Sequence, residues 1–337
     1  MLDARKTAIL RKVVTEHIET AQPVGSSHVV TDPSIGVSPA TVRADMAALE
    51  REGYLTHPHT SAGRIPTDKG YRFFVDNLAD EPLLDPKSSE EVSDFFARAH
   101  GELERMLRDT SQLLSRLTDH AAVVVAPAHE AAAVRSSLLT RLAPRVVLHV
   151  VVLANGVVEK HVVDIDESTS DDTLAEANAA LAAHVCGETL GHVPSPVRTG
   201  RPDLDEIVER CCRRLADSES SKPLADPDDV YVGGAARMAQ QFSAVDQVRE
   251  VLSILEQSFV VVSLLRDVLS AGHSVSIGTE NRVDSLAECS IVVAPYEVDN
   301  EVVGTIGVLG PTRMNYPQAL AAVAVVSQRL GRQLSRG

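Results

Sequence analysis

Hydrophobic and polar positions in the first 78 residues predict four helices and one hairpin. Apolar side chains recur at helical spacing in residues 2–20, and Pro23–His28 opens a second, short helix. Ser38 predicts the start of a third helix, because its side chain can cap the first turn and Pro39 suits the first helical position. Gly53 marks the end of this helix. Its inward side chains form one narrow apolar stripe, Val42, Met46 and Leu49.

Two short β segments and a fourth helix follow. Tyr54–Pro58 and Arg64–Thr67 are expected to pair as a hairpin, whose tip is formed by the small residues Thr60 to Gly63. Thr67 then caps a helix over Asp68–Leu78, with apolar side chains on its inward face. Two short helices followed by a hairpin are typical of a winged helix-turn-helix, whose second helix enters the major groove of DNA.

The outward face of the third helix carries small and polar side chains. Alanine methyl groups can contact thymine methyls in the major groove, while threonine and arginine reach base edges or phosphates. An ordinary solvent-facing helix is the alternative, since alanine is favourable throughout a helix. The hairpin favours the DNA interpretation, because its tip and its basic side chains would meet phosphates. The predicted DNA-binding residues are Ser26, Ser27, His28, Ser38, Ala40, Thr41, Arg43, Ala44, Ala47, Arg51, His57, His59, Thr60, Ser61 and Arg64.

His57 and His59 could also serve as metal ligands. No third or fourth ligand lies near them along the chain, so the sequence favours DNA contact over a metal site. The chain also shows no nucleophile elbow, P-loop, H-E-x-x-H pair or dinucleotide fingerprint. We therefore predict no catalytic residues, no cofactor and no metal.

Residues 79–337 predict an α+β body. Residues 79–89 are rich in proline and acidic side chains, as in a linker, and a long helix is expected from there to about residue 119. Its apolar positions repeat about every 3.5 residues, which fits coiled-coil pairing or packing on a sheet. A hairpin over residues 145–165 is predicted from its turn, Asn155-Gly156. Further strands are expected near 274–277, 290–298 and 301–308, before a closing helix over 317–334.

Strands flanked by helices at both ends of the body indicate one antiparallel α+β domain that is interrupted in the middle. The interruption is acidic and loop-rich near residues 218–229, and a helix over residues 245–270 leads back into the sheet. The predicted organisation is a DNA-binding domain at 1–78, a linker at 79–89, a first α+β part at 90–166, an inserted segment at 167–245 and a second α+β part at 246–337.

Charge is divided unevenly along the chain. The net charge is −15, yet residues 1–78 carry nine Lys and Arg and nine Asp and Glu. All of the negative excess therefore lies in residues 79–337, which suits a DNA reader attached to a body that avoids the phosphate backbone. Non-specific DNA affinity is expected to be modest, so that two reader domains would have to act together.

Composition indicates a reduced, non-exported protein. The cysteines, at positions 186, 211, 212 and 289, show no paired spacing and predict free thiols in a cytosolic protein. The amino terminus has early charges and no signal-peptide core, and no apolar run reaches about 18 residues, so neither export nor a membrane span is expected. With 3% aromatic residues and no tryptophan, a stacking platform for single-stranded nucleic acid is disfavoured.

Several of these motifs resemble a known family. The runs PVGSSHVV, SPATVRADMAALEREGYL and HPHTSAGRIPTDKGYRFFVDNL are similar to the amino-terminal domain of the HrcA family of heat-inducible transcription repressors. The runs SIGTEN and GTIGVLGPTRMNY are similar to its carboxy-terminal part. The resemblance covers most of the chain and is weakest from about 167 to 245. One departure is Ala44, where asparagine is common in the family, so a side chain able to read adenine is missing.

The resemblance implies both architecture and function. It implies a winged helix-turn-helix followed by a GAF-like antiparallel α+β domain, with an inserted segment that helps dimerisation. It also implies a dimeric repressor of heat-shock (chaperone) genes that binds an inverted-repeat operator. The GroE chaperonin would help keep the repressor active, and heat would release repression.

A small-molecule effector is the main alternative, because GAF-like domains often contain a pocket. Its candidate residues are Gly278, Glu280, Asn281 and Arg313. In the simpler interpretation, the glycines at 304, 307 and 310 shape a tight hairpin and Arg313 pairs with an acidic neighbour. A regulator released by a metabolite, or an acidic body that docks another protein, therefore remains an alternative to the heat-shock repressor.

Overall fold

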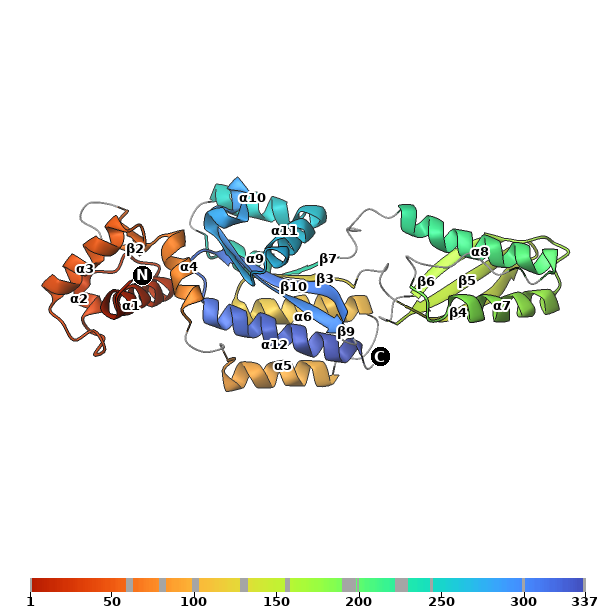
Figure 1. Ribbon diagram of the computed structural model, residues 1–337, viewed down its shortest axis with the longest axis horizontal. Helices are drawn as coiled ribbons and strands as arrows, with labels where there is room; N and C mark the ends of the chain where they lie inside the picture. The colour runs from red at the N-terminus through yellow and green to blue at the C-terminus, as the bar shows by residue number, and fades with distance from the viewer. Residues whose placement is uncertain are drawn as a thin grey trace.

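Three units follow one another along the longest axis of the computed structural model (Figure 1). We call residues 2–78 the N-terminal unit, residues 83–127 with 230–335 the central unit, and residues 133–221 the outer unit. The structure describes residues 2–58, 63–78, 83–98, 103–127, 133–154, 158–189, 198, 200–221, 230–242, 245–298 and 301–335.

The N-terminal unit consists of four helices and a short hairpin, in the order expected from the sequence. Their bounds are α1 Ala4–Thr20, α2 Ser26–Val29, α3 Pro39–Arg51, β1 Leu55–Thr56, β2 Ile65–Pro66 and α4 Asp68–Asp76. Ser38 caps α3 as predicted, its Oγ accepting a hydrogen bond from Thr41 N at 3.2 Å. Gly53 follows the helix with a φ of 79°, and Thr67 caps α4. Local capping chemistry therefore places these helix ends.

The hairpin is anchored to the rest of the N-terminal unit through its second strand. Val24 and Arg64 exchange two backbone hydrogen bonds of 2.8 and 2.9 Å, so the segment before α2 pairs with the hairpin. Gly63 permits this approach, since a Cβ there would lie 2.5 Å from the Val24 carbonyl oxygen. The predicted stripe of α3 is buried in the core of the same unit.

The central unit is a five-stranded antiparallel sheet between two helical layers, with strand order β7-β3-β10-β9-β8. Helices α5, α6 and α12 lie on one face, and α9, α10 and α11 on the other (Figure 1). The bounds are α5 Pro86–Arg98, α6 Leu103–Thr118, β3 Ala121–Val125, β7 Val230–Gly233, α9 Ala235–Ala239, α10 Val245–Leu255, α11 Ser258–Ser270, β8 Val275–Ile277, β9 Cys289–Val298, β10 Glu301–Pro311 and α12 Tyr316–Leu334.

Strand β3 shows why this sheet has a nearly continuous apolar sequence. Ala122 and Val124 belong to the core under α6 and α12, whereas Ala121 and Val123 belong to the core under α10 and α11. Because successive side chains point to opposite faces, a strand covered on both faces is apolar throughout. The later strands expected from the sequence are confirmed as β8, β9 and β10.

The outer unit has its own sheet and its own core. It contains β4 Val134–Ala143, β5 Val146–Leu153, β6 Val158–Asp164, α7 Asp171–Val185 and α8 Pro202–Ser221. The strands pair in the order β4-β5-β6, and α7 and α8 pack together over one face. The predicted hairpin is confirmed as β5 and β6, while its predicted turn, Asn155-Gly156, lies outside the described residues.

The structure places the inserted segment differently from the predicted 167–245. The β5–β6 hairpin, assigned from the sequence to the first α+β part, belongs to the outer unit because it pairs with β4 and packs under α7 and α8. The insert also ends earlier, since β7 pairs with β3 in the central sheet, with Val230 opposite Val125. Alternating strands fit either sheet equally well, and their pairing partners are remote in the sequence.

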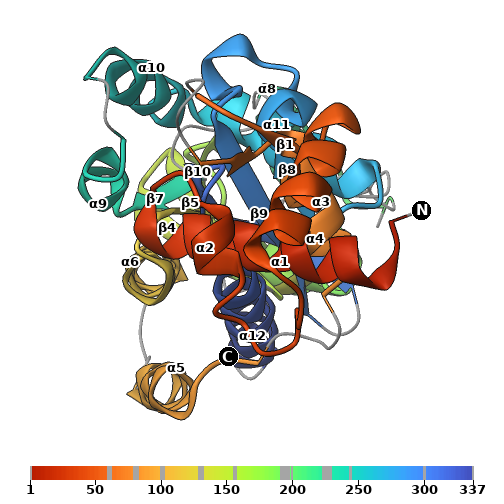
Figure 2. The ribbon, with the colours of Figure 1, turned by 90° about the vertical axis from the view of Figure 1, so that its left-hand side faces the viewer.

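The long helix expected up to residue 119 is two helices. Arg116 Nε of α6 lies 3.3 Å from Glu91 Oε1 of α5, whereas the same separation of 25 residues along one helix would span about 37 Å. Figure 2 shows α5 and α6 end-on as separate helices beside α12. Helix α5 also begins at Pro86, inside the predicted linker, and the helix predicted over 245–270 is divided into α10 and α11. No helix in the described part of the chain has the length and hydropathy needed to cross a membrane.

Candidate nucleic-acid interface

Helix α3 presents the predicted contact residues on the side away from the core. The exposed ones are Ser38, Ala40, Arg43, Ala44 and Arg51, and the half-buried ones are Thr41 and Ala47. Helices α2 and α3 lie at the free end of the molecule (Figures 1 and 2). A helix with methyl and polar groups on its open side, at the end of the molecule, can enter a major groove about 12 Å wide.

Arg43 is the cation best placed to read a base. Within the described residues it forms no ion pair, whereas Arg5, Lys6 and Arg64 are each paired with a carboxylate of the N-terminal unit. Arg51, at the end of α3, is exposed, and its Nε donates to the Ala47 carbonyl oxygen at 3.3 Å. Arg43 can therefore donate to a base edge or a phosphate without breaking one of these internal pairs.

Glu50 holds the basic side chains of the hairpin. Arg64 Nη2 lies 2.9 Å from Glu50 Oε2, and His57 Nδ1 forms a hydrogen bond with Glu50 Oε1. Burial opposes ionisation of Glu50, but the hydrogen bonds from His57 and Arg64 outweigh it and lower the pKa of the carboxyl. Arg64 was expected on phosphates. Its side chain is half-buried and pairs with Glu50 of α3 at the base of the hairpin.

The first turn of α2 supplies the other predicted contacts. Ser27 and His28 are exposed, Ser26 is half-buried, and His28 Nδ1 lies 3.2 Å from Glu16 Oε1. Three more predicted contact residues, His59, Thr60 and Ser61, lie outside the described residues. The predicted contact residues that the structure describes thus lie on α2, on α3 and at the base of the hairpin, at one end of the N-terminal unit.

Asp45 is a structural residue of this surface that the sequence pattern did not single out. It is buried on α3, and its carboxylate accepts hydrogen bonds from Arg5 Nε at 2.7 Å and Nη2 at 3.4 Å. This forked pair joins α1 to α3 and so helps to hold the helix that presents Arg43. The available signal was an acidic residue beside the apolar stripe, since a buried carboxylate requires a partner.

The four residues considered for an effector pocket do not line one cavity. Glu280 and Asn281 line a groove of about 620 Å³ beside α11 and β8, but Gly278 and Arg313 do not. Asn281 Nδ2 donates to two backbone carbonyls, at 2.8 and 3.0 Å. Arg313 Nη2 donates to the Gln241 carbonyl oxygen at 2.6 Å, rather than to the acidic neighbour that the simpler interpretation expected. Asn281 and Arg313 therefore both bind backbone carbonyls of the central unit.

Comparison with known proteins identifies the family. The family model described as the HrcA protein C terminal domain matches residues 104–320, which span the central and outer units. A "Heat-inducible transcription repressor HrcA" from Symbiobacterium thermophilum is 35% identical, over 98% of this chain and 98% of its own length. The chain belongs to the HrcA family.

Other relatives named HrcA match the chain to a similar extent. Those from Pseudarthrobacter chlorophenolicus and Streptomyces avermitilis are 38% and 37% identical, each over 99% of both chains. A crystal structure described as a hypothetical protein has the same fold, with a TM-score of 0.61 at 21% identity, over 99% of this chain and 98% of that one. The relatives are named as transcription repressors, so the predictions of the family and of a regulator rather than an enzyme are confirmed.

This HrcA chain exposes a second surface, on the outer unit. On the side of the sheet away from α7 and α8, Leu138, Val158 and Val162 are 52%, 48% and 55% exposed. Half-buried apolar side chains of β5 lie between them, at 148, 150 and 152. We call these six residues the apolar face. Exposed apolar patches of this kind are typical of protein–protein contacts.

Proposed function

We propose that this chain is a dimeric repressor of heat-shock genes, whose N-terminal units are winged helix-turn-helix domains that bind an inverted-repeat operator. The outward side of α3 carries this proposal, because it combines small side chains with Arg43, which no described carboxylate holds. Full-length relatives are named heat-inducible transcription repressors, which supports control of transcription and a response to heat.

In the proposed complex, α3 enters the major groove. Alanine methyls of its outward side contact thymine methyls, Arg43 donates to a base edge, and Arg51 and the first turn of α2 contact phosphates. The hairpin lies beside the duplex backbone or minor groove. Arg64 contributes by holding the hairpin base through Glu50 rather than by a phosphate contact of its own.

Dimerisation in this proposal uses the apolar face of the outer unit, and the central unit is a GAF-like domain. A second copy of the same face would cover side chains that a single chain leaves in water, and burial of apolar surface contributes about 25 cal/mol per Å². A two-fold axis through such a contact relates the two N-terminal units as the halves of an inverted repeat are related. Once one N-terminal unit is bound, the second binds its half-site at a high effective concentration, so the dimer has a higher affinity than either unit alone.

Heat acts in this proposal through the chaperonin GroE and through the stability of the repressor, in the cytoplasm. The apolar face of a single chain is the kind of surface that attracts chaperones, so GroE would bind chains that have not yet dimerised. Heat fills the chaperonin with other clients, and a loss of about 1 kcal/mol in stability changes the active population several-fold. The test is to refold the repressor with and without GroE and to measure the fraction that binds the operator. An equal fraction in both would contradict the proposed role of GroE.

Operator selection followed by titration tests this function. The purified protein selects from random duplexes, and the selected sequence is titrated beside a scrambled duplex at several salt concentrations. We expect an inverted repeat, two chains per duplex, and affinity that falls with salt as phosphate contacts release counterions. Equal, weak binding to both duplexes would contradict the proposal and favour a protein-docking role, whereas release by a metabolite would indicate an effector-sensing regulator.

A further inference from the structure

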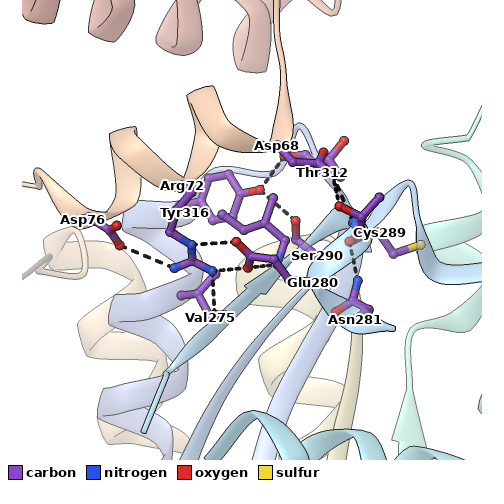
Figure 3. Close-up of polar contacts among 12 residues, drawn as sticks. Asp68, Arg72, Asp76, Val275, Glu280, Asn281, Cys289, Ser290, Thr312 and Tyr316 are labelled. Atoms are coloured by element: carbon purple, nitrogen blue, oxygen red, sulfur yellow. Dashed lines mark hydrogen bonds and ion pairs between the residues drawn. The ribbon is translucent and has the colours of Figure 1, made fainter. Parts of the chain in front are cut away.

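The N-terminal unit has one covalent connection to the rest of the chain, after α4. One connection leaves the relative orientation of two domains free unless their surfaces also bind each other. Here α4 packs beside β8 and the short 3-10 turn Gly278–Asn281 that follows it. Figure 3 shows the polar contacts across this junction. The orientation of α3 therefore depends on side chains of α4 and of this turn.

Arg72 makes several contacts across the junction. Its Nε lies 3.0 Å from Glu280 Oε1, its Nη2 also binds the Glu280 carboxylate, and Nη2 donates to the Val275 carbonyl oxygen at 2.9 Å. Glu280 is itself held on its turn, because Oε2 accepts a hydrogen bond from Ile277 N at 2.9 Å. The hydrogen bond and charge of Glu280 raise the pKa of Arg72. A forked guanidinium–carboxylate pair fixes angle as well as distance.

Asp68, one helical turn earlier on α4, makes a second polar contact. Its Oδ2 accepts hydrogen bonds from both N and Oγ1 of Thr279, each at 3.0 Å. Gly278 permits this approach, since its φ is 55° and a Cβ there would lie 2.4 Å from the Asp68 carboxylate. We call Asp68, Arg72, Gly278, Thr279 and Glu280 the clasp.

Between the two polar contacts, the units share an apolar core. Tyr71 of α4 is buried, and its ring centroid lies 5.8 Å from that of Tyr316 on α12. The Tyr71 hydroxyl bonds His17 Nδ1 at 2.8 Å, and the Tyr316 hydroxyl donates to the Thr312 carbonyl oxygen at 2.6 Å. Apolar burial holds the units together, while the hydrogen bonds around it resist sliding and rotation.

Helix α4 transmits this orientation to α3. Thr67, at the cap of α4, donates through Oγ1 to the Gly53 carbonyl oxygen at 2.7 Å. Lys69 Nζ lies 4.3 Å from the centroid of the Tyr54 ring, and Tyr54 N donates to the Leu49 carbonyl oxygen of α3 at 2.9 Å. The central unit is thus linked to α3 through the clasp, α4 and the base of the hairpin.

We propose that the clasp sets the distance and angle between the two α3 helices of a dimer, so that Asp68 and Arg72 are positioning residues for operator spacing. This role rests on the dimeric DNA-binding function proposed above. Each base pair added between half-sites moves the second site by about 3.4 Å and turns it by about 35°. A rigid dimer loses its second contact when this spacing changes, whereas loosely tethered readers adapt to it.

The first measurement concerns orientation alone. Spin labels at Glu19→Cys on α1 and Arg329→Cys on α12, in a Cys186→Ser background, report the distance between the N-terminal and central units, because both positions are exposed. Labelled chains are diluted with unlabelled protein so that each distance belongs to one chain. We expect a narrow distribution for the wild type and a broad one for Arg72→Ala. A broad wild-type distribution would overturn the proposal.

The second measurement concerns operator spacing. Inverted repeats whose spacer is lengthened or shortened by two base pairs are titrated beside the selected one. The wild type should prefer its own spacing by about a hundredfold. Arg72→Ala should reduce this preference about tenfold while leaving the affinity for a single half-site unchanged, which corresponds to about 1.4 kcal/mol of lost coupling between the readers. An unchanged preference in Arg72→Ala would contradict the positioning role.

Two further variants separate this role from a loss of folding. The exchange Arg72→Glu with Glu280→Arg should restore much of the narrow distance distribution and of the spacing preference. Arg98→Ala is the matched control, because Arg98 is 80% exposed and its ion-pair partner, Asp94, lies on the same helix. A narrow distance distribution without selection of any inverted repeat would refute the function proposed above, and with it the link to spacing, while leaving the oriented junction intact.

Discussion

The N-terminal and outer units lie at opposite ends of the molecule and expose opposite chemistry. The open side of α3 carries alanine methyls among serine, threonine and arginine groups, whereas the open side of the outer sheet carries leucine and valine. The N-terminal unit buries the inner side of α3 in a core that continues into the central unit, whereas the outer unit buries the other side of its sheet in a core of its own. The first surface suits a charged and grooved ligand, and the second suits an apolar protein surface. One chain therefore exposes two chemically different surfaces at a distance from each other.

The interiors of the two units differ as well. The N-terminal unit contains an ion pair between helices, Arg5 with Asp45, at its partly open side. The outer unit contains an uncharged polar contact deep in its core, where His149 Nε2 lies 2.9 Å from Ser137 Oγ. His149 should therefore make the outer unit sensitive to acid, while salt should mainly affect binding by the N-terminal unit.

Charging the apolar face should have the largest effect on this contrast. Leu138→Asp with Val162→Asp places two carboxylates where the proposed dimer would bury them, and an unpaired buried interfacial charge costs about 2–5 kcal/mol. Sedimentation velocity should show monomers, and operator affinity should fall at least about a hundredfold. Leu83→Asp is the control, since Leu83 is 89% exposed and lies outside this sheet. A doubly charged variant that remained dimeric would place the dimer contact elsewhere.

Acid should have the next largest effect, which in the outer unit is expected to act through His149. Burial, with a smaller contribution from the nearby His161, lowers the pKa of His149 from 6.5 to about 4. The unfolded chain therefore takes up the proton first as pH falls. Stability from the neutral imidazole is complete above pH 6.5 and is lost towards pH 4, by up to about 3 kcal/mol.

Amide hydrogen exchange in β5, measured between pH 7 and about 4 and corrected for the intrinsic rate, follows this loss of stability. His149→Gln removes the titrating ring and keeps a side chain that can bond Ser137, so it should flatten the pH dependence in β5. Strand β3 of the central unit is the internal comparison, because burial also lowers the pKa of the adjacent His120 to about 4, and its pH dependence should stay unchanged in this variant. If the pH dependence in β5 survived this substitution, another group would be responsible.

Arg43→Ala should have the smallest of these effects and should act on the N-terminal unit. Loss of a contact to a base edge costs about 1–3 kcal/mol, so the operator Kd should rise about tenfold and the preference for one base per half-site should relax. Arg51→Ala should instead weaken all sequences alike and reduce the salt slope by about 1. Selection from random duplexes measures both, and an unchanged selected sequence would remove Arg43 from the base-reading set.

The N-terminal unit was largely predictable because its signals are local. Ser38, Gly53 and Thr67 act within a few residues of themselves, at helix ends that the structure places where they were expected. The face of α3 was predictable for the same reason, since helical periodicity alone decides which side chains share a side. The ion pair of Arg64 with Glu50 was not predictable in this way, because Glu50 lies on the preceding helix and becomes a neighbour only when the hairpin folds back.

The outer unit shows the opposite case. The period of β5 and β6 correctly indicated a hairpin, yet the same alternation fits either of the two sheets of this molecule. Strand β4 escaped the sequence pattern, and with it the sheet to which the hairpin belongs. The repeat over residues 90–119 was likewise real, but it reflects packing of α5 and α6 against α12 rather than one long helix.

Local chemistry along this chain is thus sufficient for its helix ends, its hairpins, the open side of α3 and the resemblance to the HrcA family. Sheet membership, the apolar face and the clasp depend on contacts between remote positions, such as Arg72 and Glu280, which are 208 residues apart. Periodicity and capping act over a few residues, whereas the pairing of distant segments depends on which arrangement buries the most apolar surface and satisfies the polar groups at its edges. The pairing of distant segments is therefore decided only by the tertiary structure.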